Sequence, residues 1–294
     1  MSSHALKKNS QPQLPVSDDV LHSLQRGEWV FPTFVPALRA TFEATQRRNE
    51  GHFLAELPLF ILTSMFYKKE FLPISVATRF FAQRQSVAGK IATLTTPEER
   101  TFWESAFATV SPETAPCEAS TPEIVALETA VGLLDRHVRV KSTSPVSKAI
   151  AAFASFDSEK FRSASHPHYL GCIFLRLNRP AGETALSLAH ELAHQELFLL
   201  NFADRLITAA ADYRLVHAPF QGRQRPSIGR LHAAHALFRM TDHERATQDA
   251  RLQKHVETLQ ATIDTFQNSD LTEFGRKLVY EVYQPHVTHL CGRG

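Results

Sequence analysis

The sequence predicts a predominantly helical α+β protein, and three observations support this class. Most segments of the 294-residue chain, 43% of which is hydrophobic, have the apolar patterns and end signals of helices. Residues 168–177 (HYLGCIFLRL) instead form a short apolar run of the kind found in buried strands. An apolar helical stretch at residues 185–202 follows and contains the pattern H-E-x-x-H. We therefore expect a central HExxH helix preceded by a buried strand, together with an N-terminal helical lobe.

The N-terminal lobe is expected to span residues 19–141, after a disordered tail at residues 1–18. The tail lacks the apolar core and small-residue cleavage site of a secretory signal. A helical pattern covers residues 21–50, and we expect it to break around Pro32 and Pro36, because proline removes a backbone donor.

Three further elements are expected in this lobe. Residues 52–67 form its most apolar segment, which is shorter than the roughly 20 residues needed to cross a bilayer and is predicted to be a core helix. Within residues 93–120, a short capped helix is expected to start near Thr96, before a loop rich in Ser, Thr and Pro. Another helix is predicted from Thr121 as its N-cap and Pro122 at its first position.

The second half of the chain, residues 142–294, is predicted to be the metal-binding catalytic region. Within residues 168–177, the apolar run of the strand is bounded by Gly171 on one side and by the turn-forming sequence NRPAG on the other. That turn leads directly into the HExxH helix. Further apolar patterns predict additional helices. The helices expected here span residues 183–202, 230–240, 243–266 and 272–283.

Charge and cysteine content limit the function classes. The chain has 32 basic and 30 acidic residues and a formal net charge of +2, which does not favour a nucleic-acid or membrane-surface partner. Its three cysteines are far apart in sequence, so they suggest neither a disulfide framework nor a thiolate metal cluster. We expect a cytoplasmic protein, whose oligomeric state the sequence does not predict.

The motif H-E-x-x-H consists of His190, Glu191 and His194. At about 100° per residue, side chains four positions apart lie on one helix face, so both imidazoles can bind one metal ion. Glu191 lies beside that face. Burying two imidazoles and a carboxylate in an apolar helix is costly unless a shared partner offsets their desolvation. A metal ion is therefore favoured over two histidines that satisfy only local hydrogen bonds.

A catalytic metal site usually needs a third protein ligand. Glu196 is two positions from His194 and should point away from the ion, and Asp204 and Asp212 lack a convincing spacing. Histidines further along the chain are better candidates. His232 and His235 lie three apart on a predicted helix, beyond a loop long enough to fold back, and either can supply the third ligand.

Several ordered segments carry a family resemblance over roughly residues 120–285. The strand HYLGCIFLRL, the motif LAHELAHQELFLL, the segment YRLVHAPFQGRQRPSIGRLHAAHALF and the closing LTEFGRKLVYEV resemble the HExxH-type peptide β-hydroxylases. These enzymes are linked to modification of ribosomally made peptides and are understood as iron(II)- and 2-oxoglutarate-dependent oxygenases. The positions in matching order are Tyr213, Pro219, Arg225, Pro226, Gly229, Leu231 and His232.

The resemblance implies that His190, His194 and His232 bind iron(II), with 2-oxoglutarate as cosubstrate and O2 as oxidant. It implies hydroxylation of a side-chain β-carbon in a peptide. Two positions depart from the family pattern: Phe220 replaces a tryptophan and Gln221 replaces an arginine. The second departure puts a cosubstrate role of position 221 in doubt.

Three neutral imidazoles leave the double charge of the ion uncompensated, which favours a dianionic ligand such as 2-oxoglutarate. The distal carboxylate of that ligand needs a cation, and the arginine fork suits it. Arg225 is the first candidate, followed by Arg223 and Arg214, and Tyr213 is a candidate pocket hydroxyl. In this oxygenase Glu191 would orient a ligand or a bound water.

Two other functions remain open. In a zinc-dependent metallopeptidase, Glu191 would act as general base for the attacking water, with His190 and His194 as zinc ligands. A regulatory or scaffold protein that keeps a relic of the site would bind neither metal nor cosubstrate tightly.

Overall fold

The computed structural model describes residues 18–46, 59–68, 86–137, 149–158 and 160–292. It is mostly helical and has two small sheets, which confirms the predicted α+β, predominantly helical class. The disordered tail predicted up to residue 18 falls almost entirely outside the described ranges. The boundary predicted between residues 141 and 142 also lies outside the described residues.

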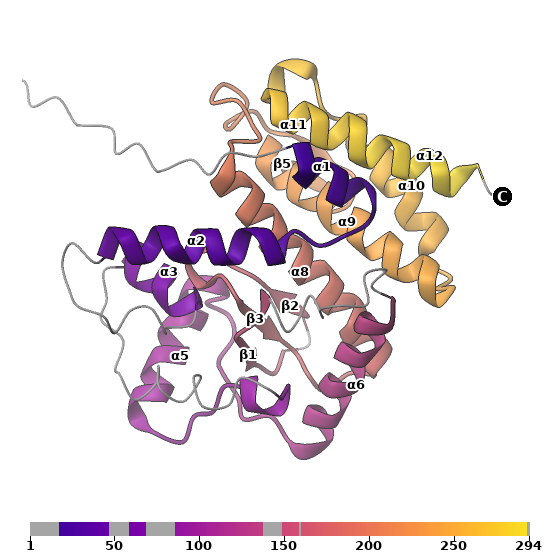
Figure 1. Cartoon of the computed structure of the whole chain (residues 1–294). Helices are drawn as coiled ribbons and strands as arrows, with labels where there is room; N and C mark the ends of the chain where they lie inside the picture. Colours follow the sequence, from indigo (N-terminus) through magenta and orange to yellow (C-terminus); the bar gives the residue numbers. More distant parts are fainter. Residues whose placement is uncertain (1–17, 47–58, 69–85, 138–148, 159, 293–294) are drawn as a thin grey trace, which may run out of the picture.

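A three-stranded sheet lies at the centre of the molecule (Figure 1). Its middle strand β3 (Cys172–Leu175) is parallel to β1 (Ala152–Ser155) and antiparallel to the edge strand β2 (Ser163–Ala164). Every residue of β1 and β3 is buried. This burial explains why β3 has a continuous apolar sequence rather than an alternating one.

The N-terminal helices are α1 (Asp18–Gln25), α2 (Phe31–Gln46) and α3 (Leu59–Lys68). The breaks predicted at the two prolines were wrong, because α2 runs through both of them. Pro32 lies in the first turn, where its missing N–H has no intrahelical partner to lose. The chain breaks earlier, at Gly27, whose φ of 75° is readily adopted only by glycine.

Two helices cover the sheet from the middle of the chain. α5 (Pro97–Val110) starts at the predicted N-cap, Thr96, which forms a capping box with Glu99. α6 (Thr121–His137) begins one residue earlier than predicted: Thr121, the predicted N-cap, is its first residue, and the carboxylate of Glu123 accepts from the backbone N–H of the preceding Ser120. A short 3-10 turn, η2 (Ala88–Lys90), precedes them.

The second half begins with another 3-10 turn, η3 (Pro167–Tyr169), before β3. α8 (Ala181–Ala203) then carries the HExxH motif, and a hairpin of β4 (Val216–Ala218) and β5 (Arg223–Arg225) leads into α9 (Ser227–Thr247).

The prediction of one helix over residues 243–266 was wrong, because α9 extends to Thr247 and α10 (Leu252–Ile263) is separate. The break occurs at Gln248, which has a left-handed φ of 55° and caps α9 with its backbone N–H.

The C-terminal segment is helical but irregular. The predicted helix at residues 272–283 divides into the short helix α11 and a π-helix, and a further helix follows. These elements are η4 (Asn268–Asp270), α11 (Glu273–Lys277), η5 (Leu278–Tyr283) and α12 (Gln284–Cys291).

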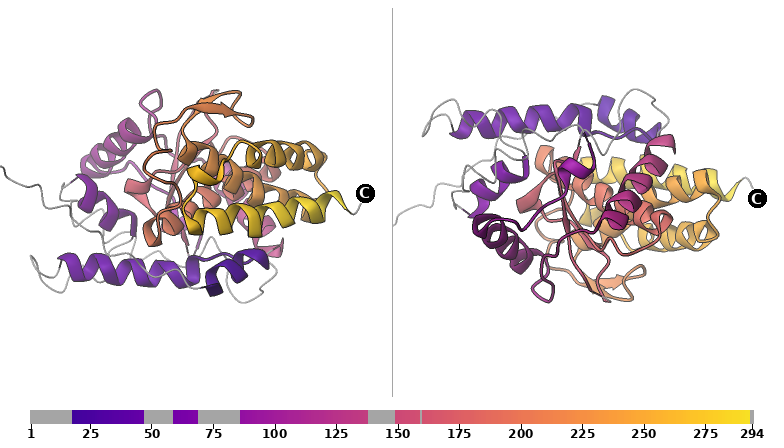
Figure 2. Two further views of the ribbon diagram at one scale, coloured as in Figure 1. Left: turned by 90° about the horizontal axis from the view of Figure 1, so that it is seen from above. Right: turned by 90° about the horizontal axis from the view of Figure 1, so that it is seen from below.

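The arrangement places α8 next to the sheet and α9 along α8, with the C-terminal helices beyond (Figure 1). The β4–β5 hairpin lies on the side of the molecule opposite α1 and α2 (Figure 2). One continuous hydrophobic core contains residues of the early helices, the sheet and the late helices. None of the helices in the described ranges combines the length and apolar character needed to cross a membrane.

Candidate metal centre

α8 carries the motif histidines, which are half-buried. Its first turns are fixed by Arg179, which donates to the hydroxyl of Ser187 at 3.0 Å and forms an ion pair with Glu183. Leucine and alanine side chains bury most faces of the helix, as its apolar sequence requires. The motif therefore lies on a rigid element and not on a loop.

The structure brings His190, His194 and His232 together. The Nε2 atoms of His190 and His194 are 2.9 Å apart, as expected for two imidazoles one turn apart on α8. His232 comes from α9, and its Nδ1 atom lies 3.1 Å from Nδ1 of His194. Three imidazoles from two helices thus form one continuous cluster.

Two of these imidazoles are held in the neutral form. Burial lowers the pKa of His194 well below its ordinary value, and the neighbouring histidines lower it further. Burial also lowers the pKa of His232, to about 3. Neutral imidazole is the form that binds a metal ion, so the protonation state of these two rings suits that role at neutral pH.

The His190–His194 pair matches a divalent metal in kind and spacing. Two nitrogens that bind one ion at right angles, each about 2.1 Å from it, are about 3.0 Å apart, close to the separation in this pair. The His232 ring does not face the same point, because His194 contacts His190 with Nε2 and His232 with Nδ1. Within the described ranges, no group of three or more His, Cys, Asp or Glu side chains is arranged so that it could hold a metal ion.

His235, the alternative third ligand, belongs to a different cluster. Its Nε2 atom lies 2.8 Å from the carboxylate of Glu196 and its Nδ1 atom 2.7 Å from the hydroxyl of Tyr283. Arg239 donates to both oxygens of the same carboxylate, at 2.7 and 2.8 Å. Burial alone would raise the pKa of Glu196, but Arg239 and His235 lower it to about 2. Both nitrogens of His235 are therefore engaged, and Glu196 points away from the imidazole cluster, as predicted.

Glu191 is buried beside the histidine pair, and its two oxygens have different surroundings. Oε2 accepts a hydrogen bond of 2.6 Å from the hydroxyl of Ser165, which directly follows β2. Oε1 lies 4.0 Å from Nε2 of His190. The hydroxyl thus holds one oxygen, while the other stays on the side of the imidazole cluster.

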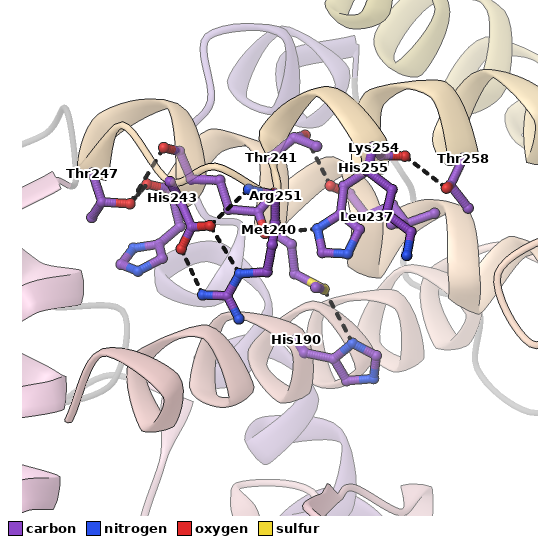
Figure 3. Close-up of polar contacts among 12 residues, drawn as sticks. His190, Leu237, Met240, Thr241, His243, Thr247, Arg251, Lys254, His255 and Thr258 are labelled. Atoms are coloured by element: carbon purple, nitrogen blue, oxygen red, sulfur yellow. Dashed lines mark hydrogen bonds and ion pairs between the residues drawn. The ribbon is translucent and has the colours of Figure 1, made fainter. Parts of the chain in front are cut away.

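Two apolar side chains lie next to His190: Met240, which the sequence did not identify, and Phe220, which it identified only as a departure from the family pattern. The Nδ1 atom of His190 lies 3.3 Å from the sulfur of Met240, which reaches down from α9 (Figure 3). The ring of Phe220, in the hairpin turn, is 6.1 Å from the His190 ring and 6.4 Å from that of His255. No motif spacing predicts either contact, because both depend on how α9 and the hairpin fold back.

The predicted cosubstrate arginines have different environments. Arg225 is the last residue of β5, just before α9, and is half-buried. Its buried Nε atom has no hydrogen-bond partner among the described residues. Arg223 is the first residue of β5 and is exposed. Arg214 forms an ion pair with Asp270, so its charge is already compensated.

The remaining candidates lie outside the cluster. Tyr213 is 89% exposed, so the structure does not bring its hydroxyl into a pocket, contrary to the prediction. Asp212 forms an ion pair with Arg205, and Asp204 follows the C-terminal end of α8. Neither carboxylate lies with the motif histidines.

Comparison of the sequence with known protein families and with curated proteins gives no match.

Proposed function

We propose that this protein is an iron(II)- and 2-oxoglutarate-dependent oxygenase that hydroxylates a side-chain β-carbon of a peptide. The observation that supports the proposal best is the cluster of three half-buried imidazoles that α8 and α9 bring together. His190, His194 and His232 would hold the ion, which would supply the activation of O2. Glu191 lies beside these rings, with Oε1 4.0 Å from Nε2 of His190, but it is not one of the proposed ligands. A dianionic cosubstrate would therefore supply the negative charge bound directly to the ion.

The surroundings of Arg225 support a role in binding the distal carboxylate of 2-oxoglutarate. Its side chain crosses the first turn of α9 at Gly229: a Cβ atom there would lie 3.6 Å from Cβ and 3.8 Å from Cδ of Arg225. His232 is three residues after Gly229, about one turn further along α9. Burial, and secondarily the charge of Arg223, lower the pKa of Arg225, and the charge of an anionic ligand would raise it.

The other residues of the site would position reactants. Glu191, fixed by Ser165, would accept a hydrogen bond from a water or substrate group beside His190. Phe220 covers His190 from the hairpin and would help to exclude bulk water. Met240 would hold the ring of His190 with its Nε2 atom toward His194.

One observation favours a second candidate, a zinc-dependent peptidase. The free oxygen of Glu191 is 4.0 Å from Nε2 of His190, close enough to share a metal-bound water and to act as its general base. The hydrogen bond from Ser165 opposes this role, because it ties one oxygen of the carboxylate to the segment after β2.

Anaerobic loading distinguishes the two candidates. The metal-free protein is loaded with iron(II) and then 2-oxoglutarate, and we expect a weak visible charge-transfer band, with succinate forming after O2 is admitted. Arg225→Gln should weaken 2-oxoglutarate binding about tenfold or more, whereas Arg223→Gln should have a small effect. If the zinc-loaded protein hydrolyses peptides, loses that activity in Glu191→Gln and shows no iron band, the peptidase assignment replaces the oxygenase.

A further inference from the structure

The central sheet has an unpaired edge next to the candidate metal centre. The strand order is β1-β3-β2, so β2 has a neighbour on one side only. β2 also contacts α8, the helix that carries the motif. An unpaired edge presents backbone donors and acceptors that another extended chain can use.

The register identifies the backbone groups that face outward. The backbone N–H of Arg176 donates to the carbonyl of Arg162 at 3.0 Å, so these two residues form a hydrogen-bonded pair of the antiparallel ladder. Because such pairs alternate, Ala164 also faces β3, whereas Ser163 and Ser165 direct their N–H and C=O groups away from the sheet. Among the described residues, no backbone hydrogen bond uses these outward groups.

The side chains along this edge are small. Ser163, Ala164 and Ser165 are small and half-buried, and none is the proline or lysine that often protects edge strands. The outward groups of Ser163 and Ser165 repeat every second residue, about 6.7 Å apart. An extended peptide backbone has donors and acceptors at the same repeat.

We propose that the edge of β2 binds the peptide substrate in extended form, as an added strand paired with Ser163 and Ser165. Added strands lie about 4.8 Å from their neighbour, so the peptide would run beside the segment in which Ser165 holds Glu191. Main-chain bonds would supply affinity and direct the peptide toward His190. This inference rests on the proposed function for the identity of the occupant as a substrate peptide.

The experiment uses the metal-free full-length chain and a displayed library of random dodecapeptides as the probe. Enriched peptides are synthesised with a fluorescent label, and their Kd values are measured for three proteins: wild type, Ser163→Pro and Ser163→Ala. The proline removes only an outward N–H, which an edge strand tolerates, and Ser163→Ala retains it. We expect Ser163→Pro to bind about tenfold more weakly or worse and Ser163→Ala to bind like the wild type.

A second measurement leaves the protein unchanged. Single N-methyl groups are introduced along an enriched peptide, and strand addition predicts that binding is lost at every second position only. Equal affinity for wild type and Ser163→Pro, the absence of the alternating pattern, or the absence of any enriched peptide would overturn the proposal.

The iron band is recorded separately for wild type and Ser163→Pro, and both should give it. Peptide binding that depends on Ser163 without an iron band in either protein would reject the proposed oxygenase and keep the docking edge. An iron band in both proteins, without peptide binding that depends on Ser163, would keep the proposed oxygenase and reject the docking edge.

Discussion

At the scale of single residues, His194 is the centre of the candidate site, because it contacts both other imidazoles with different ring nitrogens. His190 depends on contacts from α9 and the hairpin, and Glu191 on a hydroxyl from the sheet edge. Each motif side chain therefore has a partner from another element. These contacts hold the three rings next to one another.

The two histidines of α9 should respond differently to substitution. We expect His232→Ala to lower iron(II) or zinc affinity at least tenfold while changing the free energy of unfolding only modestly, since the ring is half-buried. His235→Ala should instead destabilise the protein by about 2–4 kcal/mol, because it removes a buried ring and the buried partner of the Tyr283 hydroxyl, and leaves Glu196 with Arg239 but without His235. Metal titrations and urea unfolding measure both effects. Unchanged metal affinity in His232→Ala would remove it from the ligand set.

The sequence predicted which two histidines of α8 meet, but not which histidine of α9 joins them, and this difference has a physical cause. The spacing of His190 and His194 is a local property of one helix, so it predicted their contact. His232 and His235 are only three residues apart, and the local pattern could not say which would meet α8. In the structure, Glu196 of α8 contacts His235, whereas His232 contacts His194.

At the scale of elements, the sequence predicted helices with clear end signals and missed irregular ones. The capping box of α5 and the apolar run of β3 are local signals, and both elements occur where expected. The β4–β5 hairpin and the π-helix η5 were not predicted, because the hairpin is short and polar and a π-helix has no sequence signature in this chain. Both depend on tertiary packing.

Two glycines provide a matched test of element packing. A Cβ atom at Gly275 in α11 would lie 2.0 Å from the carbonyl oxygen of Leu206, so Gly275→Ala should destabilise the protein by about 2–4 kcal/mol. Gly132 in α6 has open space around its Cβ position. Gly132→Ala should be neutral or stabilising by up to about 1 kcal/mol, because alanine favours a helix. Urea unfolding midpoints of both variants check the prediction, and equal midpoints would show that α11 can move away from Leu206.

At the scale of the whole molecule, early and late segments form one packed unit. Arg239 of α9 donates to the backbone carbonyls of Gly27 and Glu28 at 3.1 and 2.6 Å and stacks over Trp29. Residues 19–141 are predicted to form an N-terminal helical lobe, and periodicity does not predict which elements such a lobe contacts. The carbonyl groups that follow α1 are held by the same arginine that binds Glu196 in α8.

The stability of the whole molecule should fall with acidification below pH 6.5. Burial lowers the pKa of His286 to about 4, from an ordinary value of 6.5, and its Nε2 atom contacts Thr241 at 2.9 Å. Between these values the unfolded chain binds a proton that the folded chain does not, so the free energy of unfolding decreases as the pH falls. This group contributes at most about 1.4 kcal/mol per pH unit.

Urea unfolding at pH 6.5, 5.5 and 4.5 measures that slope. His286→Gln should show a shallower decrease than the wild type, and the remaining slope should come from His194 and His232, whose pKa values are lowered in the same direction. Parallel curves for the two proteins would contradict the assignment to His286.

The division of the imidazole cluster between α8 and α9 has a consequence for biosynthesis. On the ribosome, His190 and His194 emerge first, and the third ring follows only after the loop and hairpin between the two helices have been made. On the proposed function, the nascent chain therefore offers an incomplete and weak chelator throughout its synthesis. Delivery of the ion becomes a late step in maturation, after the helices have packed.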